Sequence, residues 1–162
     1  MQGNKRKTSK FDVLLSRERR LNDFDYAIGI DCGKNTGVAV WNCRERRFEL
    51  IKTMLIHQAL RYVCDFKDAG KGKYSIMVKV EDARQRYMFG STGSEKWQGA
   101  GSIKRDSTIW EDFLVDLKIP HQMSAPRNSI TKLDAARFRM LTKWEGRTNE
   151  HSRDAAMLVF GL

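Results

Sequence analysis

The chain has 162 residues, of which 41% are hydrophobic and 31% are charged. These proportions are typical of a folded globular domain and exclude a largely disordered chain. No apolar run approaches the roughly 20 residues that span a bilayer, so we do not expect a membrane partner. Lys and Arg number 30 against 20 Asp and Glu, which gives a formal net charge of +10. Such an excess favours a polyanionic partner, nucleic acid in the first place.

The N-terminal segment, residues 1–22, carries seven basic side chains against two acidic ones. We expect a basic arm that lies along phosphates, or a solvated tail, ahead of a single domain over residues 23–162. The segment lacks the apolar core of a secretory signal. The three cysteines have no spacing typical of a disulfide framework or a zinc site. The sequence therefore predicts an intracellular, cytoplasmic protein.

Residues 26–41 predict a β-hairpin, because two apolar runs flank a glycine-bounded turn. The first run ends in a single carboxylate, Asp31. A charge at the end of a buried strand is costly unless something pairs with it, and a metal cation is the usual partner. We expect residues 48–53 to add a third, antiparallel strand.

The next elements predict a second carboxylate beside the first. Helical spacing of apolar residues covers 56–68, and another apolar run, 74–81, ends in Glu81. Because a helix separates this strand from the hairpin, the connection is a crossover, and the two strands should be parallel. Their ends would then bring Asp31 and Glu81 side by side, whereas Asp82 should point to the opposite face.

Residues 84–101 predict a long loop in which cations alternate with aromatic rings. This combination binds phosphates and stacks on unpaired bases, but the rings could equally pack the loop onto the core. The residues expected to contact DNA there are Arg84, Arg86, Tyr87, Phe89 and Lys96.

The C-terminal part predicts a helix over 102–118, a short strand over 121–125 and a helix from about 132 to 146. The apolar stripe of the first of these helices could serve the core or an interface with a second copy of the chain.

A last helix begins after Asn149, a suitable capping residue, and carries His151 and Asp154 three residues apart on one face. Alone, this pair could be a capping arrangement, because acidic residues favour the first turn of a helix. Beside Asp31 and Glu81, it completes a set of metal-ligand types.

With these motifs in place, the chain resembles the RuvC-type Holliday junction resolvases of the RNase H-like nuclease superfamily, and in its C-terminal sequence their compact phage-type members. The resemblance covers roughly residues 26–162. Its motifs are I-G-I-D-C-G-x-x-T-G at 28–37, V-K-V-E at 78–81, A-P-R at 125–127 and H-x-x-D-A-A at 151–156. It implies an α/β fold with a five-stranded mixed sheet flanked by helices, the first three strands antiparallel and the fourth and fifth parallel to the first. It also implies a bacterial cell or a phage-infected host.

The resemblance implies catalytic roles and metal binding for one set of side chains and DNA contacts for others. The first set is Asp31, Glu81, His151 and Asp154, which would hold Mg²⁺, with Mn²⁺ able to substitute and two ions in each site. Tyr87 or Phe89 would wedge between bases at the junction centre. We add Arg127 and Lys132 to the expected DNA-binding residues. The chain is shorter than the family between Pro126 and Lys132, so the resemblance identifies no catalytic lysine.

The expected function is a metal-dependent endonuclease that resolves four-way DNA junctions as a homodimer, by paired symmetric nicks. Two alternatives use the same residues: an RNase H-like nuclease for forks, flaps or RNA–DNA hybrids, and a DNA-binding module without activity. The hairpin also resembles the phosphate loop of actin-like sugar kinases and heat-shock ATPases. Those proteins need two lobes, which 162 residues hardly supply.

Overall fold

The computed structural model describes residues 23–85, 94–126 and 132–162. The predicted basic arm over 1–22 lies outside the described residues, as do the following expected DNA contacts: Arg86, Tyr87, Phe89 and Arg127.

The described chain alternates between strands and helices. The strands are β1 (Tyr26–Asp31), β2 (Asn35–Asn42), β3 (Arg47–Leu55), β4 (Ile76–Glu81) and β5 (His121–Ser124). The helices are α2 (Ile56–Ala69), α3 (Ser94–Asp116), α4 (Ala135–Thr142) and α5 (Glu150–Val159), with a short 3₁₀ turn, η2 (Ala83–Gln85).

The strands form one five-stranded mixed sheet in the order β3-β2-β1-β4-β5. β1 pairs antiparallel with β2, and β2 pairs antiparallel with β3. β4 is parallel to β1 and β5 is parallel to β4. This confirms the predicted α/β fold class, and the order and directions of the strands are consistent with an RNase H-like fold.

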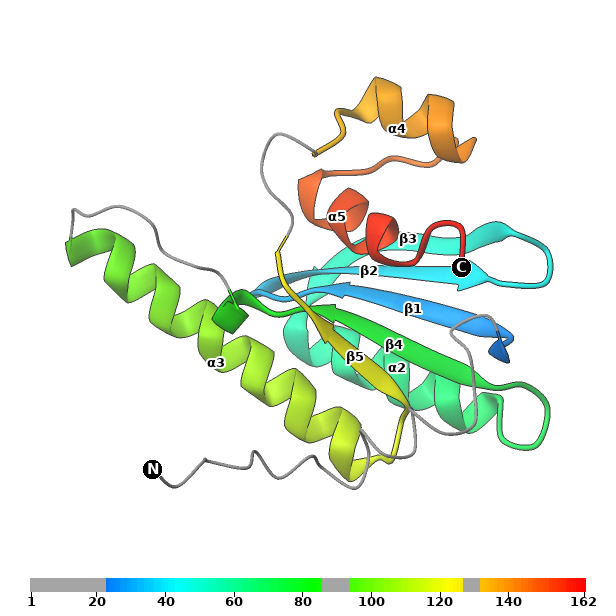
Figure 1. Ribbon diagram of the computed structural model, residues 1–162, viewed down its shortest axis with the longest axis horizontal. Helices are drawn as coiled ribbons and strands as arrows, with labels where there is room; N and C mark the ends of the chain where they lie inside the picture. Colours follow the sequence, from blue (N-terminus) through cyan, green and yellow to red (C-terminus); the bar gives the residue numbers. More distant parts are fainter. Residues whose placement is uncertain (1–22, 86–93, 127–131) are drawn as a thin grey trace, which may run out of the picture.

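Helices cover both faces of the sheet, so its central strands are hydrophobic on both sides (Figure 1). α2 and α3 pack on one face, where the buried side chains include Ile28, Ile30, Val63, Val78, Trp110 and Leu114. α5 packs on the other face with α4 beyond it, over a second cluster that includes Ala27, Trp41, Met77, Phe138 and Val159. Alternate residues of one strand therefore serve opposite cores.

Two glycines let α5 lie directly on the sheet. A Cβ added at Gly29 would collide with the carbonyl oxygen of Ala155, and one added at Gly37 would collide with that of His151. Each collision is with helix backbone, which cannot move aside as the end of a side chain can. The absence of a side chain at these positions thus sets how close the first turns of α5 come to β1 and β2.

The prediction for residues 84–101 was wrong in its second half. α3 begins at Ser94 rather than at Ser102, so residues 94–101 are helix and not loop. Gly99 and Gly101 suggested a loop, but a glycine inside a helix costs only about 1 kcal/mol. Trp110 and Leu114 anchor the later turns of the helix in the core, and the helix extends back from them.

The helix predicted over 132–146 is also shorter than expected. α4 begins after Asp134, whose side chain accepts a hydrogen bond from the backbone N–H of Arg137. It ends at Lys143, which has left-handed backbone geometry with φ 59°. Met140 and Leu141 of this helix are 73% and 48% exposed, although both are large apolar side chains. Phe138 is the residue that this helix buries.

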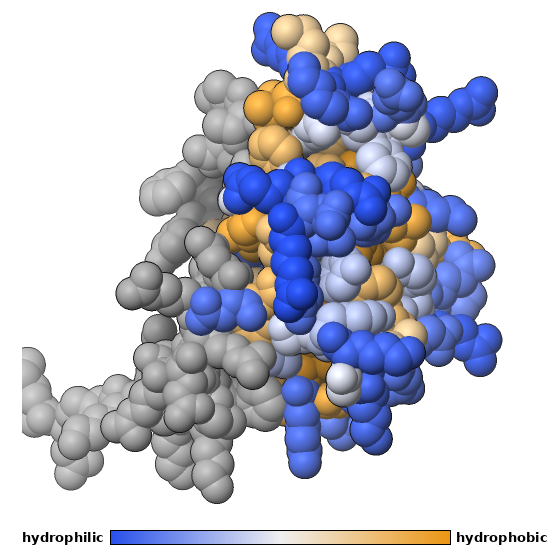
Figure 2. Space-filling view, turned by 90° about the vertical axis from the view of Figure 1, so that its right-hand side faces the viewer, coloured by the Kyte–Doolittle hydropathy of each residue, from blue (hydrophilic) through white to orange (hydrophobic). Residues whose placement is uncertain are grey.

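Figure 2 views the side of the molecule that carries the β2–β3 turn and the turn between α2 and β4. Hydrophilic residues cover most of this face and separate the hydrophobic ones. Within the described residues, no helix is both long and apolar enough to cross a bilayer.

Candidate active site

Asp31 and Glu81 are direct neighbours at the ends of two parallel strands. Their Cα positions are register partners in the β1–β4 pairing. Residues two apart on a strand share a face, so Asp31 lies on the same face as Ala27, and Glu81 on the same face as Met77. Ala27 and Met77 belong to the cluster on the α5 side of the sheet. Both carboxylates therefore belong to the face that α5 covers, and the register confirms the predicted side-by-side position of Asp31 and Glu81.

His151 connects α5 to the carboxylate of β1. Its Nδ1 lies 2.9 Å from Oδ2 of Asp31, so Nδ1 carries the hydrogen of this bond. Asn149 caps the helix by accepting from the backbone N–H of Ser152, which confirms the predicted start. The Asn149 side chain also accepts from Thr53 Oγ1 at 2.6 Å and so ties the start of α5 to β3.

Asp154, one turn further along α5, holds the ammonium group of Lys132. Lys132 Nζ lies 2.6 Å from Oδ2 of Asp154 and 2.7 Å from Oε1 of Glu150. Burial disfavours the charged lysine, but the two carboxylates outweigh this and raise its pKa. The same contact lowers the pKa of Glu150. Lys132, an expected DNA contact, is thus ion-paired inside the candidate site.

The pKa of Asp31 is raised above its ordinary value of 3.8. Burial is the largest cause, since it disfavours the charged form, and the hydrogen bond from His151 opposes it. The negative charge of Asp154 raises the pKa of Asp31 further, and the positive charge of Lys132 lowers it. Side chains from β1, α5 and the segment before α4 therefore form one electrostatic group.

The donor types fit a hard divalent cation. Asp31, Glu81 and Asp154 offer carboxylate oxygens and His151 an imidazole, a set that suits Mg²⁺ or Mn²⁺. Asp154 already pairs with one cation, the ammonium group of Lys132. As the side chains lie, no three or more His, Cys, Asp or Glu in the described part of the chain are grouped closely enough to hold an ion. Binding would require the carboxylates to turn toward one another.

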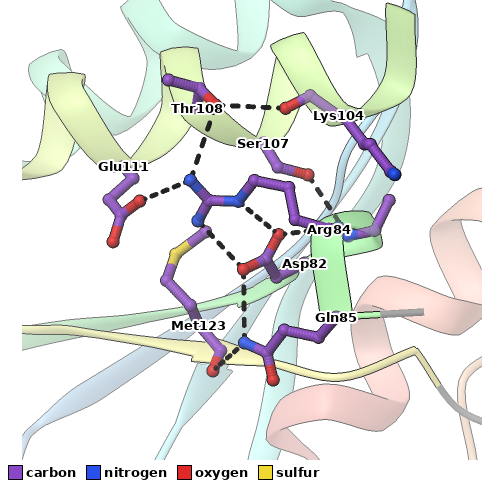
Figure 3. Close-up of polar contacts among 9 residues, drawn as sticks. Asp82, Arg84, Gln85, Lys104, Ser107, Thr108, Glu111 and Met123 are labelled. Atoms are coloured by element: carbon purple, nitrogen blue, oxygen red, sulfur yellow. Dashed lines mark hydrogen bonds and ion pairs between the residues drawn. The ribbon is translucent and has the colours of Figure 1, made fainter. Parts of the chain in front are cut away.

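Asp82 follows Glu81 but faces α3, which confirms the predicted opposite orientation. Figure 3 shows its carboxylate held by the guanidinium of Arg84, with Nε and Nη2 at 2.7 and 2.9 Å from the two oxygens. Nη1 of Arg84 lies 2.7 Å from Oε2 of Glu111 on α3. The expected contact of Arg84 with DNA stays a prediction, and its guanidinium is already engaged with two carboxylates.

Two parts of this arrangement were not predicted. Glu150 lies four residues before Asp154 on α5, so helical spacing alone could have placed the two carboxylates on one face. The pairing of Lys132 with both depends on the path of the chain into α4 and left no signal in the local sequence. Of the other expected DNA contacts, Lys96 lies in the first turns of α3.

No protein-family model matches the chain, and no curated protein matches it. The sheet order and strand directions are consistent with an RNase H-like fold and assign the chain to no family.

Proposed function

We propose that this protein is a metal-dependent endonuclease that cuts branched DNA, with the four-way junction as its main substrate. One observation carries the proposal. Asp31 and Glu81 are register partners on adjacent parallel strands, on the face where α5 brings His151 into hydrogen-bonding contact with Asp31. A structural role for an end-of-strand charge explains either carboxylate separately, but it does not explain why two converge beneath a helix that adds a histidine and a third carboxylate.

Phosphodiester hydrolysis needs an activated water and stabilisation of negative charge on the attacking and leaving oxygens. Divalent cations held by Asp31, Glu81, His151 and Asp154 would supply both. Asp31 fixes the imidazole of His151 through Nδ1, which leaves Nε2 as the nitrogen available to a ligand or a water. Burial of Asp31 keeps competing water away from one side of the site.

The substrate and the oligomeric state are the finer parts of the proposal. The net charge of +10 favours a polyanion, and the choice of a branched DNA follows from the resemblance to junction resolvases. The same resemblance favours a homodimer with two active sites. α3 is the candidate interface, because Ile109 and Val115 are 39% and 46% exposed while its opposite side packs on the sheet.

The test is cleavage of a labelled four-way junction, with duplex, fork and RNA–DNA hybrid of matched sequence beside it. Each reaction is run with Mg²⁺, with Mn²⁺ and with EDTA. We expect paired, symmetric nicks confined to the junction and lost in EDTA. Preferred cutting of the fork or the hybrid would keep the chemistry and change the substrate. Tight junction binding with no cutting in either metal would instead favour a binding module.

A further inference from the structure

The positively charged side chain of Lys132 contacts Asp154, one of the proposed metal ligands. Its ammonium nitrogen lies 2.6 Å from Asp154, whose side chain is 14% exposed, and 2.7 Å from Glu150, whose side chain is 64% exposed. The carboxylate that would bind a divalent cation is therefore already neutralised. A metal ion that binds Asp154 either displaces this ammonium or binds beside it, on the same or the other carboxylate oxygen, at the cost of repulsion between like charges.

A hydrogen bond ties the backbone after Lys132 to α5, whereas the flexible lysine side chain allows its ammonium to change partners. The carbonyl oxygen of Leu133 accepts a hydrogen bond from Nε of Arg153 at 3.0 Å, which ties this segment to α5. Glu150 lies outside the proposed ligand set and can keep the ammonium near the site after it leaves Asp154. A phosphate group offers the ammonium a new partner at the same place, because lysine binds phosphates as a compact point charge.

We propose that Lys132 is an internal counter-ion of Asp154 that moves to a DNA phosphate, so that metal binding and DNA binding at this site favour one another. The inference rests on the proposed function. DNA draws the ammonium from Asp154 and exposes the carboxylate to the metal, and the metal in turn releases the ammonium to the DNA. Linkage requires that each ligand raise the affinity for the other by the same factor.

The experiment compares the wild-type protein with Lys132→Met, which keeps most of the side-chain length and removes the charge. Mn²⁺ affinity is measured by titration calorimetry on the full chain, without DNA and with a four-way junction whose phosphorothioate linkages slow cutting. Without DNA, we expect Lys132→Met to bind Mn²⁺ about three- to tenfold more tightly than the wild type. The junction should raise the Mn²⁺ affinity of the wild type and have a much smaller effect on the variant.

Two further variants separate the possible outcomes. Lys71→Met, in an exposed turn after α2, makes the same change in net charge far from the site and should leave Mn²⁺ affinity unchanged. Asp154→Asn should weaken Mn²⁺ binding. Equal Mn²⁺ affinity of Lys132→Met and the wild type, with binding still dependent on Asp154, would overturn the counter-ion role and leave the proposed function standing. Absence of Mn²⁺ binding from every protein, with and without DNA, would overturn both.

Discussion

Asp31 and Asp82 are two buried carboxylates at the same end of the sheet, and they differ in what surrounds them. Asp31 is 9% exposed and Asp82 is 3% exposed. Asp82 receives four hydrogen bonds from Arg84 and Gln85. Burial would raise its pKa, but these bonds lower it instead. Asp31 receives a hydrogen bond from His151, and burial still raises its pKa.

The comparison teaches that burial alone does not identify a functional carboxylate. The chain compensates the charge of Asp82 with a guanidinium from the next turn, so this charge has a complete structural explanation. The charge of Asp31 is less well compensated, and the Lys132 ammonium that lowers its pKa is directly bonded to Asp154. This difference supports the proposal that Asp31 takes a cation from solution. The predictions below test this contrast.

The largest expected effect is on cutting. Asp31→Asn, Glu81→Gln and Asp154→Asn should each lower the rate of junction cleavage by at least about 100-fold, because each removes a carboxylate proposed to hold the metal. Junction binding, measured by gel shift in EDTA, should change little. Asp65→Asn on the exposed side of α2 is the matched control and should cut normally. Full activity in any of the first three proteins would break the site assignment.

The next effect is on stability and should have opposite signs for the two aspartates. Asp82→Asn weakens the charge-assisted bonds of Arg84 and should lower the free energy of unfolding by about 2 kcal/mol. Asp31→Asn removes a charge that the fold disfavours and should maintain or raise the free energy of unfolding. Urea unfolding in EDTA measures both. A loss of stability in Asp31→Asn as large as that in Asp82→Asn would remove the distinction between the two sites.

The contributions of Asp82 and Asp31 to the free energy of unfolding should also change with pH in opposite directions. The pKa of Asp82 is lowered in the folded protein, so its contribution to stability is present above 3.8 and is lost as the pH falls through the lower, folded-state pKa. The pKa of Asp31 is raised, so its contribution is complete below 3.8 and is lost as the pH rises through the folded-state pKa.

Unfolding curves from about pH 3 to about pH 6 can separate the two. The stability gap between wild type and Asp82→Asn should narrow toward the acidic end. The stability of Asp31→Asn relative to the wild type should increase toward the neutral end. Parallel curves for all three proteins would show that neither aspartate titrates differently in the folded chain.

Much of this contrast could be read from the sequence, because it depends on strand parity. Asp31 and Glu81 each end an apolar run, and a crossover connection makes the two strands parallel, so the sequence predicts their proximity. The same alternation turns Asp82 to the opposite face. His151 and Asp154 could be placed on one side of a helix by their spacing.

Other features depended on tertiary structure. Arg84 looked like a cation free to bind phosphates, although its main partner, Asp82, lies only two residues before it. Its second partner, Glu111 on α3, left no signal in the local sequence. Lys132 looked similar for the same reason. The early start of α3 was missed because its glycines suggested a loop, whereas residues 94–101 are the first turns of a helix whose later residues Trp110 and Leu114 are buried in the core. The local sequence pattern predicted the face of the sheet on which each carboxylate lies. It did not predict which basic side chains pair with these carboxylates.

The smallest effect tests whether the partners of Asp82 are redundant. Gln85 donates to Asp82 at 3.2 Å and to the carbonyl oxygen of Met123 at 3.2 Å, and its side chain is exposed. Gln85→Ala should therefore cost only about 0.5 kcal/mol of unfolding free energy, because Arg84 retains its bonds to both oxygens of Asp82. Gln122→Ala, at an exposed position of β5, is a control for the loss of an exposed glutamine. A cost near 2 kcal/mol for Gln85→Ala would mean that the guanidinium alone does not hold Asp82, and that the compensation of this carboxylate is a network of the whole 82–85 segment.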